Sequence, residues 1–387
     1  MIPTDEQRQL GEAAHTFLAE QAGPAAWRRT VASAPRHGFD ETLWQQVAEM
    51  GWPAAVLPVA HGGLDFGWQG LGLVFEAQGR HLACTPLLSS IVLGAGALMA
   101  CGSQAQQGDW LPRLATGELR LALALDERSR HAPAEVNTMA EPTAGGWRLT
   151  GAKSMVLDGW GVQAYVVTAR GPDGALGLYL VEAGAVGLGV ASTPMLDQRP
   201  VCRLQLDGVE VPAAARLSVT SADAAIRPMA VGTNAFELPE SLEVVLDRAR
   251  LCLAAEALGL VDDVFERTIA YLKERVQFDV PIGSFQALQH RAARLYAEIE
   301  LLRSAVRAGF HAVDEASSDV PLLASLAKAR ASDLAERVCN EAVQMHGGIG
   351  VTAEYDLGLY LKRARVIAQA LGDTVFHRDR YARLCGF

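Results

Sequence analysis

The chain has 387 residues, of which half are apolar and a fifth are charged, and its formal net charge is −10. This length and composition predict two or three globular domains and exclude a disordered chain. The acidic balance argues against a nucleic-acid partner, because a negatively charged surface repels phosphate.

Helices are predicted from the N-terminus to about residue 118. Apolar residues recur at i, i+3 and i+4 spacing in residues 5–21 and 40–52, and Asp5 and Asp40 stand where each helix would be capped. The first residues lack the basic and apolar segments of a signal peptide, so we expect a cytoplasmic protein. The longest apolar stretch, residues 87–101, is shorter than the roughly 20 residues that span a bilayer, so no membrane partner is predicted.

The sequence changes character at Leu119. Short β-rich runs, several of them alternating between apolar and polar residues, continue to about residue 232, and turn sequences such as TAGG and GPDG separate them. Three or four long amphipathic helices with short breaks then predict an up-down bundle. The predicted fold class is α+β, mainly α, with a helical domain (1–118), a β domain (119–232) and a helix bundle (233–387).

No metal site or disulfide framework is predicted. The six cysteines are scattered along the chain, at positions 84, 101, 202, 252, 339 and 385, and none forms a CxxC pair. His290 and His346 lack a metal-ligand partner at a useful spacing. We therefore expect reduced, mostly buried thiols and structural histidines.

Five segments, taken in order, resemble the acyl-CoA dehydrogenase family across almost the whole chain. They are MGWPAAVLPVAHGGLDFG, WLPRLATGELRLALALDE, GWRLTGAKSMVLDGWGVQAYVVTAR, ERVQFDVPIGSFQALQHRAARL and EAVQMHGGIGVTAEYDLGLYLKRAR. The resemblance implies a tetramer that binds FAD in an extended pose, with the bundle of one subunit completing the cofactor site of its neighbour. It also implies the family reaction. A carboxylate base removes the α-proton of an acyl-CoA thioester, the β-hydrogen leaves as hydride to the flavin, and an electron-transferring flavoprotein takes the electrons.

The resemblance assigns one set of residues to the FAD of a neighbouring subunit. Arg275 would grip the diphosphate with its guanidinium fork, and the alternative is a solvated arginine at a helix C-terminus. Phe278 would pack on the cofactor and Gln286 would bond its adenosine part, although either could belong to the bundle core.

The segment that begins at Gln344 is similar to the family's second C-terminal signature. Gly347 and Gly348 would let the backbone approach the diphosphate with no Cβ in the way, and Gln344 would also contact the cofactor. The alternative is an ordinary helix C-cap followed by a loop.

The residues that the family uses for its own flavin depart from the pattern. Asp126 follows Leu125 where a threonine is usual, and the Gly- and Ser-rich turn after it is missing. Met155 and Leu157 replace an aromatic residue and a threonine that reaches flavin N5. The Leu157 side chain cannot form a hydrogen bond, while Met155 could lie against a flavin ring or fill a gap in the core.

The residues at the positions of the catalytic base also differ from the family pattern. Gly372 stands at the usual Glu position, followed by Asp373 and by Thr374, which would contact the cofactor. Asp373 is the candidate base, but it is one residue displaced and one methylene shorter, and a helix cap is the alternative. At the second location that the family uses, Ala249 replaces the Glu, and the nearby Glu256 is better explained as a polar residue of the bundle.

Groups for a neighbour's cofactor are therefore retained, whereas groups for the chain's own flavin and substrate are degraded. The sequence resembles the subunit type of bacterial heterotetrameric acyl-CoA dehydrogenases that lacks the catalytic Glu, several of which act on bulky substrates such as steroid side-chain CoA thioesters. Fatty acid or steroid side-chain degradation is therefore the expected context. The predicted partners are a catalytic paralogue, an acyl-CoA and the electron-transferring flavoprotein. Three alternatives stay open: a self-sufficient homotetramer with Asp373 as base, a flavin-free structural subunit, and a flavin oxidase or monooxygenase.

Overall fold

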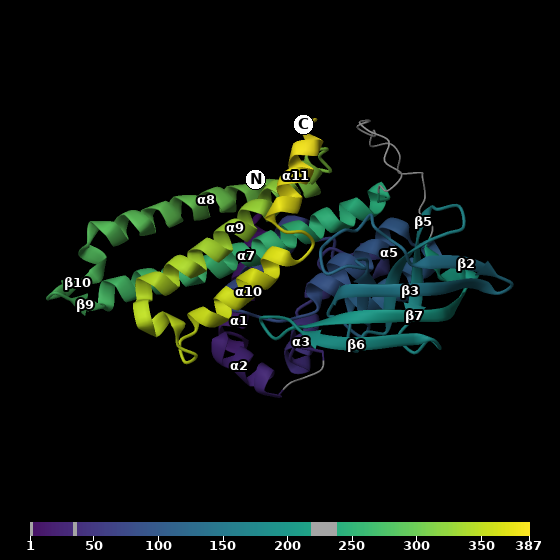
Figure 1. Cartoon of the computed structure of the whole chain (residues 1–387), viewed down its shortest axis with the longest axis horizontal. Coiled ribbons are helices and arrows are strands. Elements are labelled where there is room, and N and C mark those ends of the chain that lie inside the picture. The colour runs from purple at the N-terminus through teal and green to yellow at the C-terminus, as the bar shows by residue number, and fades with distance from the viewer. Residues whose placement is uncertain (1–2, 34–36, 218–237) are drawn as a thin grey trace.

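The computed structural model describes residues 3–33, 37–217 and 238–387 and has the predicted architecture of two helical domains around a β domain (Figure 1). The boundary predicted between residues 232 and 233 lies outside the described residues. In the described ranges, no helix is long and apolar enough to cross a membrane. All six cysteines are free there, and Cys385 alone is exposed.

The N-terminal domain consists of short helices around an apolar core. They are α1 (Asp5–Gln21), α2 (Pro24–Ser33), α3 (Glu41–Glu49), α4 (Trp68–Arg80), α5 (Gly96–Cys101) and α6 (Gln104–Ala115), with a buried π-helix at Leu87–Ala95. Asp40 caps α3 as predicted. The cap predicted for α1 is wrong by one residue, because the Thr4 hydroxyl, not Asp5, accepts from the Gln7 backbone and completes a capping box.

The β domain is one twisted sheet whose strands follow in the order β6-β7-β3-β2-β4-β5-β8, with β1 paired to β4. The strands are β1 (Leu121–Ala124), β2 (Met139–Thr143), β3 (Gly146–Leu157), β4 (Ala164–Arg170), β5 (Leu176–Glu182), β6 (Leu188–Pro194), β7 (Pro200–Pro212) and β8 (Arg216–Leu217). Strand β1 is buried on both faces: Leu121 and Leu123 pack into the helical core, and Ala122 and Ala124 into the core of the β domain. The end of β1 is therefore held between the two cores.

The C-terminal domain is a bundle of long helices that extends away from the sheet (Figure 1). Its helices are α7 (Glu240–Glu274), α8 (Gln286–Asp314), α9 (Val320–His346), α10 (Leu357–Gln369) and α11 (Thr374–Leu384). A hairpin of β9 (Val276–Gln277) and β10 (Val280–Pro281) joins α7 to α8 at the end of the bundle farthest from the sheet. The bundle therefore has one end near the sheet and another end far from it, and residues at these two ends are well separated.

Helices α4 and α7 cross at backbone contact. A Cβ added at Gly79 would lie 1.8 Å from the carbonyl oxygen of Glu256, and one added at Gly259 would lie 1.7 Å from that of Glu76. Only glycine permits so close an approach at these two positions. The N-terminal domain is thus packed firmly against the first helix of the bundle.

A buried group of charges, which we call the three-domain joint, ties all three domains together. It consists of Asp158, Asp197, Arg199, Glu256 and Arg363. Arg363 of α10 binds Asp197 of the β6–β7 turn at 2.6 Å and Glu256 of α7 at 3.0 Å, and Arg199 lies 3.4 Å from Asp158. The charged hydrogen bonds offset the unfavourable burial of these ions.

The N-terminal domain contributes neutral groups to this joint. Ser89 donates to Asp158 at 2.8 Å, and the Arg363 guanidinium donates to the Cys84 sulfur at 2.6 Å. Burial raises the pKa of the Cys84 thiol, although Arg363 opposes this effect. The thiol therefore serves the joint as a neutral acceptor.

Candidate cofactor site

The residues predicted to bind a neighbour's FAD lie at the far end of the bundle. Arg275 is the C-cap residue of α7, Phe278 sits at the tip of the β9–β10 hairpin, and Gln286 begins α8; all three side chains are exposed. Phe278 is 87% exposed, in the left-handed region at φ 54°. The alternative that Phe278 or Gln286 belongs to the core of the bundle is therefore wrong for this chain.

The end of α9 reaches the same end of the bundle. His346 stacks on Tyr271 with ring centroids 4.2 Å apart, and the Tyr271 hydroxyl donates to the His346 carbonyl at 3.3 Å. Tyr271 lies about one turn before Arg275 on α7, so the Gly347–Gly348 turn and Arg275 occupy neighbouring positions. Both glycines are exposed, and a Cβ added at either would meet nothing within 4 Å.

Gln344 is also exposed at this end, two residues before His346. The arrangement offers a guanidinium, an aromatic ring, two amides and an open glycine backbone to a ligand outside the chain. These groups fit the diphosphate and adenosine parts of FAD, because a diphosphate needs a cationic fork and backbone N–H groups. The site roles of the individual residues stay predictions.

The residues predicted for the chain's own flavin lie on the β domain. Leu125 and Asp126 are buried at the end of β1, and Leu157 is partly buried on β3. Met155, which is 36% exposed, lies at a break in strand register with φ 55°. The structure brings these four residues together but separates them from Arg275 by the length of the bundle.

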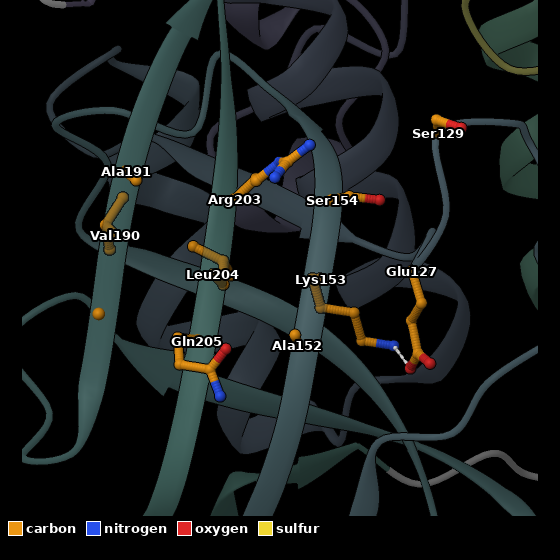
Figure 2. A pocket seen from close by; sticks show the side chains of 11 residues that line it. Glu127, Ser129, Ala152, Lys153, Ser154, Val190, Ala191, Arg203, Leu204 and Gln205 are labelled. Atoms are coloured by element: carbon orange, nitrogen blue, oxygen red, sulfur yellow. Dashed lines mark hydrogen bonds and ion pairs between the residues drawn. The ribbon is translucent and has the colours of Figure 1, made fainter.

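A groove of about 520 Å³, lined by apolar and polar residues of β3, β7 and β6 and by Glu127 and Ser129, borders this region. Figure 2 shows Lys153 and Glu127 pointing toward one another at one edge of it, with their side chains 2.8 Å apart. Lys153 also donates to Thr168 at 2.8 Å and to the Leu125 carbonyl at 3.3 Å, and burial lowers its pKa to about 8. Lys153 therefore anchors β3 to the end of β1 and has no free donor for a ligand.

The space between Asp126 and the bundle is crossed by a set of contacts that we call the interdomain clasp. It consists of Asp126, His131, Arg250 and Phe376. His131 Nδ1 lies 2.9 Å from Asp126 Oδ2, and His131 Nε2 lies 3.3 Å from Arg250 Nη2. The His131 ring meets the Phe376 ring edge to face at 4.9 Å, and the Arg250 guanidinium lies over the same ring at 5.6 Å.

The bundle side of the clasp is fixed by charge. Arg250 is fully buried and donates to Asp247 at 2.8 Å and to Glu243 at 3.0 Å, while Arg380 of α11 binds the same two carboxylates. The side chain of Ala249, where the family's alternative base would stand, is buried in α7. Glu256 pairs with Arg363 in the three-domain joint, which agrees with its interpretation as a polar residue of the bundle.

The loop at the usual position of the base has no room for a glutamate. Gly372 has φ +109°, and a Cβ added there would lie 2.5 Å from a ring carbon of Phe376 and 2.8 Å from His377 Nε2. The next residue, Asp373, caps α11 by accepting from the Phe376 backbone at 2.8 Å. The Thr374 hydroxyl donates to Asp333 at 2.8 Å. Asp373 and Thr374 thus have structural partners, and their predicted roles in catalysis and cofactor binding stay predictions.

Replacing Asp373 by alanine is expected to reduce stability by about 1 kcal/mol, the usual contribution of an N-cap, and to leave the activity of an assembled complex largely intact. Asp373→Asn is the matched control, because asparagine keeps the cap but cannot act as a base. Urea denaturation and steady-state dehydrogenation of an acyl-CoA would measure the two effects. If Asp373 were the base, Asp373→Asn would abolish activity without changing stability.

A second expectation concerns Lys328, whose ammonium group donates to the Gly372 carbonyl at 3.0 Å and to Ser332 at 3.0 Å. Burial, helped by Arg250, lowers the pKa of Lys328 to about 7. Between that pH and the ordinary lysine value, the unfolded chain binds a proton that the folded chain does not, so this residue's contribution to stability rises with pH. Compared with Lys328→Met, the wild type should gain roughly 1–2 kcal/mol between pH 7.5 and 9 in urea denaturation. An unchanged difference would show that Lys328 keeps its proton.

The sequence did not identify His131, Arg250 or Phe376 as residues of this region. A weak signal exists, because His131 stands inside the segment where the family has small turn residues. No metal site is present in the part of the chain that the structure describes, since no three His, Cys, Asp or Glu side chains cluster suitably.

Comparison with known proteins gives consistent matches along the chain. The family model "Acyl-CoA dehydrogenase, N-terminal domain" matches residues 4–118, and "Acyl-CoA dehydrogenase, C-terminal domain" matches residues 240–385. The acyl-CoA dehydrogenase FadE27 of Mycobacterium tuberculosis is 30% identical, covering 98% of this chain and 97% of its own.

Two solved structures are similar over the whole length. A variant of the Tcur3481-Tcur3483 steroid ACAD has a TM-score of 0.85 and 32% identity, covering 99% of this chain and 98% of its own. The ChsE4-ChsE5 complex from Mycobacterium tuberculosis has a TM-score of 0.87 and 28% identity, covering 100% of this chain and 98% of its own.

Proposed function

Since the chain belongs to the acyl-CoA dehydrogenase family, we propose that it is the cofactor-completing subunit of a heterotetramer in which a paralogous chain carries the catalytic base. The family places the chain among oxidoreductases that act on CH–CH bonds. In the proposed assembly, the bundle end of this chain covers FAD bound by the paralogue. The paralogue binds and deprotonates the acyl-CoA, and an electron-transferring flavoprotein takes the electrons.

The observation that carries this proposal is the separation of the two sets of predicted cofactor residues. Arg250, in the clasp, and Arg275, at the far end, lie about 37 Å apart along α7 at 1.5 Å per residue. Arg275 and the Gly347–Gly348 turn therefore cannot serve a flavin on the β domain of their own chain. In the proposed assembly they serve a cofactor held by another subunit.

Two further features support the partner role. A Cβ at Gly372 would meet Phe376 and His377, and Asp373 caps α11, which argues against a catalytic base at either position. The similar ChsE4-ChsE5 structure is a complex of two differently named chains, and the Tcur3481-Tcur3483 structure is of a steroid ACAD. On this basis we propose that the substrate is the CoA thioester of a steroid side chain or of a comparable bulky acid.

The roles of this chain's residues follow from their chemistry. The Arg275 guanidinium neutralises the diphosphate, and the open backbone at Gly347 and Gly348 gives the phosphate oxygens N–H donors without steric obstruction. The Phe278 ring covers the cofactor and shields it from water, while Gln286 and Gln344 orient it by hydrogen bonds. Bound FAD supplies the hydride acceptor of the family reaction.

The proposal is tested by measuring flavin per chain together with single-turnover bleaching by steroid side-chain and fatty acyl-CoAs, with and without a paralogue that retains the glutamate. The chain alone should hold little flavin and bleach with no acyl-CoA, and the mixed complex should hold one FAD per unlike pair and bleach. Full loading and rapid bleaching by the chain alone, abolished by Asp373→Ala, would instead establish a self-sufficient enzyme. A colourless mixed complex would indicate a flavin-free structural subunit. Rapid reaction of the reduced flavin with oxygen would indicate an oxidase or monooxygenase.

A further inference from the structure

We propose that the interdomain clasp shuts this chain's own flavin cleft, and that His131 is the residue that keeps it shut. The inference rests on the proposed function and deepens it. A subunit that had merely lost its base would keep an accessible flavin cleft. In this chain the cleft is filled by side chains from three elements.

The His131 side chain occupies the space that a flavin ring would need. A planar ring sandwiched between two layers of atoms needs roughly 7 Å between those layers, since carbon atoms pack at about 3.5 Å. Across the cleft, His131 lies 2.9 Å from Asp126 on one side and 3.3 Å from Arg250 on the other. Its ring centroid is 4.9 Å from that of Phe376, and only 3% of its side chain is exposed.

The hydrogen bonds use both nitrogens of the imidazole. The Asp126 carboxylate accepts from Nδ1–H, which leaves Nε2 as the acceptor for Arg250 Nη2–H. Arg250 cannot turn away, because Asp247 and Glu243 hold its other amino group. His131 therefore joins a fixed carboxylate on the β domain to a fixed guanidinium on α7.

The loop that carries His131 is itself anchored. Asp126 Oδ1 accepts from the backbone of Ala132 at 2.9 Å, and Arg170 donates to the carbonyls of Ala134 and Val136, at 3.0 Å in each case. The loop is therefore held independently of the His131 ring. Truncating His131 should empty the cleft without releasing the loop.

The test compares His131→Ala with His131→Gln in the full chain. Glutamine can donate to Asp126 through its amide nitrogen and accept from Arg250 through its amide oxygen, so it should preserve the clasp. Lumiflavin, which has the ring but no diphosphate, is the probe, and its fluorescence quenching reports binding. Wild type and His131→Gln should bind it at least tenfold more weakly than His131→Ala. In the mixed complex, His131→Ala should raise FAD above one per unlike pair.

Phe376→Ala is the second opening variant, because it removes the ring against which His131 packs and changes no charge. Circular dichroism would first establish that each variant is folded. If both alanine variants are folded and neither binds lumiflavin more tightly than the wild type, the proposal is overturned. The outcome is distinguishable from a failure of the proposed function. FAD at the unlike interface should depend on Arg275 and should not change when the clasp is opened.

Discussion

Replacing Arg275 by alanine is expected to weaken FAD retention in the assembled complex by one to two orders of magnitude. A charge-assisted hydrogen bond contributes about 1.5–3 kcal/mol, and the predicted contact with the diphosphate is of this kind. Arg275→Lys keeps the charge but loses the planar fork, so its flavin content should lie between those of alanine and wild type. Flavin absorbance per complex after gel filtration, together with the dissociation constant for FAD, measures the effect.

The matched control is Lys273→Ala, which removes an exposed positive charge from the last turn of the same helix. It should leave flavin content near that of the wild type, because it lies outside the predicted contact. The Arg275 side chain is exposed in the chain, so its replacement should also leave the melting temperature of the isolated subunit unchanged. If Arg275→Ala and Lys273→Ala lower flavin content equally, only general surface charge is involved and the assignment of Arg275 fails.

Replacing Arg363 by methionine is expected to reduce the free energy of unfolding by about 3–5 kcal/mol, the usual effect of breaking one side of a buried ion pair. The change leaves Asp197 and Glu256 buried without their main cationic partner. Methionine replaces the apolar stem of the arginine but carries no charge, so the loss should come from charge more than from packing. Urea denaturation followed by circular dichroism measures it as a lower midpoint.

Arg365 provides the control on the same helix. Its side chain is half exposed and pairs with Glu336 at 3.4 Å on the surface, where ion pairs contribute little. Arg365→Met should change stability by less than about 0.5 kcal/mol. Equal destabilisation by the two variants would mean that the three-domain joint contributes no more than a surface pair.

The order of the domains could be predicted because it depends on local periodicity. Helix α7 is a run of 35 residues without a proline, which is recognised as helical without its neighbours, and the alternation of buried and exposed positions along β7 distinguishes the sheet from the helices. The same local signals could not separate Thr4 from Asp5 as the cap of α1, since both residues are good caps and only the hydroxyl geometry decides.

The candidate site was predictable only where it depends on short motifs. Arg275, Phe278 and the Gly347–Gly348 turn lie within the two C-terminal signatures, and the structure gathers these residues at one exposed end. The clasp joins residues 126, 131, 250 and 376, whose contacts depend on how a loop, a strand end and two helices pack. A sequence fixes such a packing only through tertiary contacts, which periodicity cannot reveal. For the same reason, the sequence could not predict that Phe376 and His377 leave no space for a side chain at Gly372, because this depends on how the start of α11 packs.

Helix α7 holds Arg250 and Arg275 in a fixed rotational phase as well as at a fixed distance. One inserted residue between them would advance the far end by about 1.5 Å and turn it by about 100°, so that Arg275 and the β9–β10 hairpin would face a different direction. An insertion in an exposed turn such as residues 172–175 would disturb neither. Related subunits that donate cofactor contacts in this way should therefore vary in the length of their β-domain turns while the count of residues along this helix stays constant.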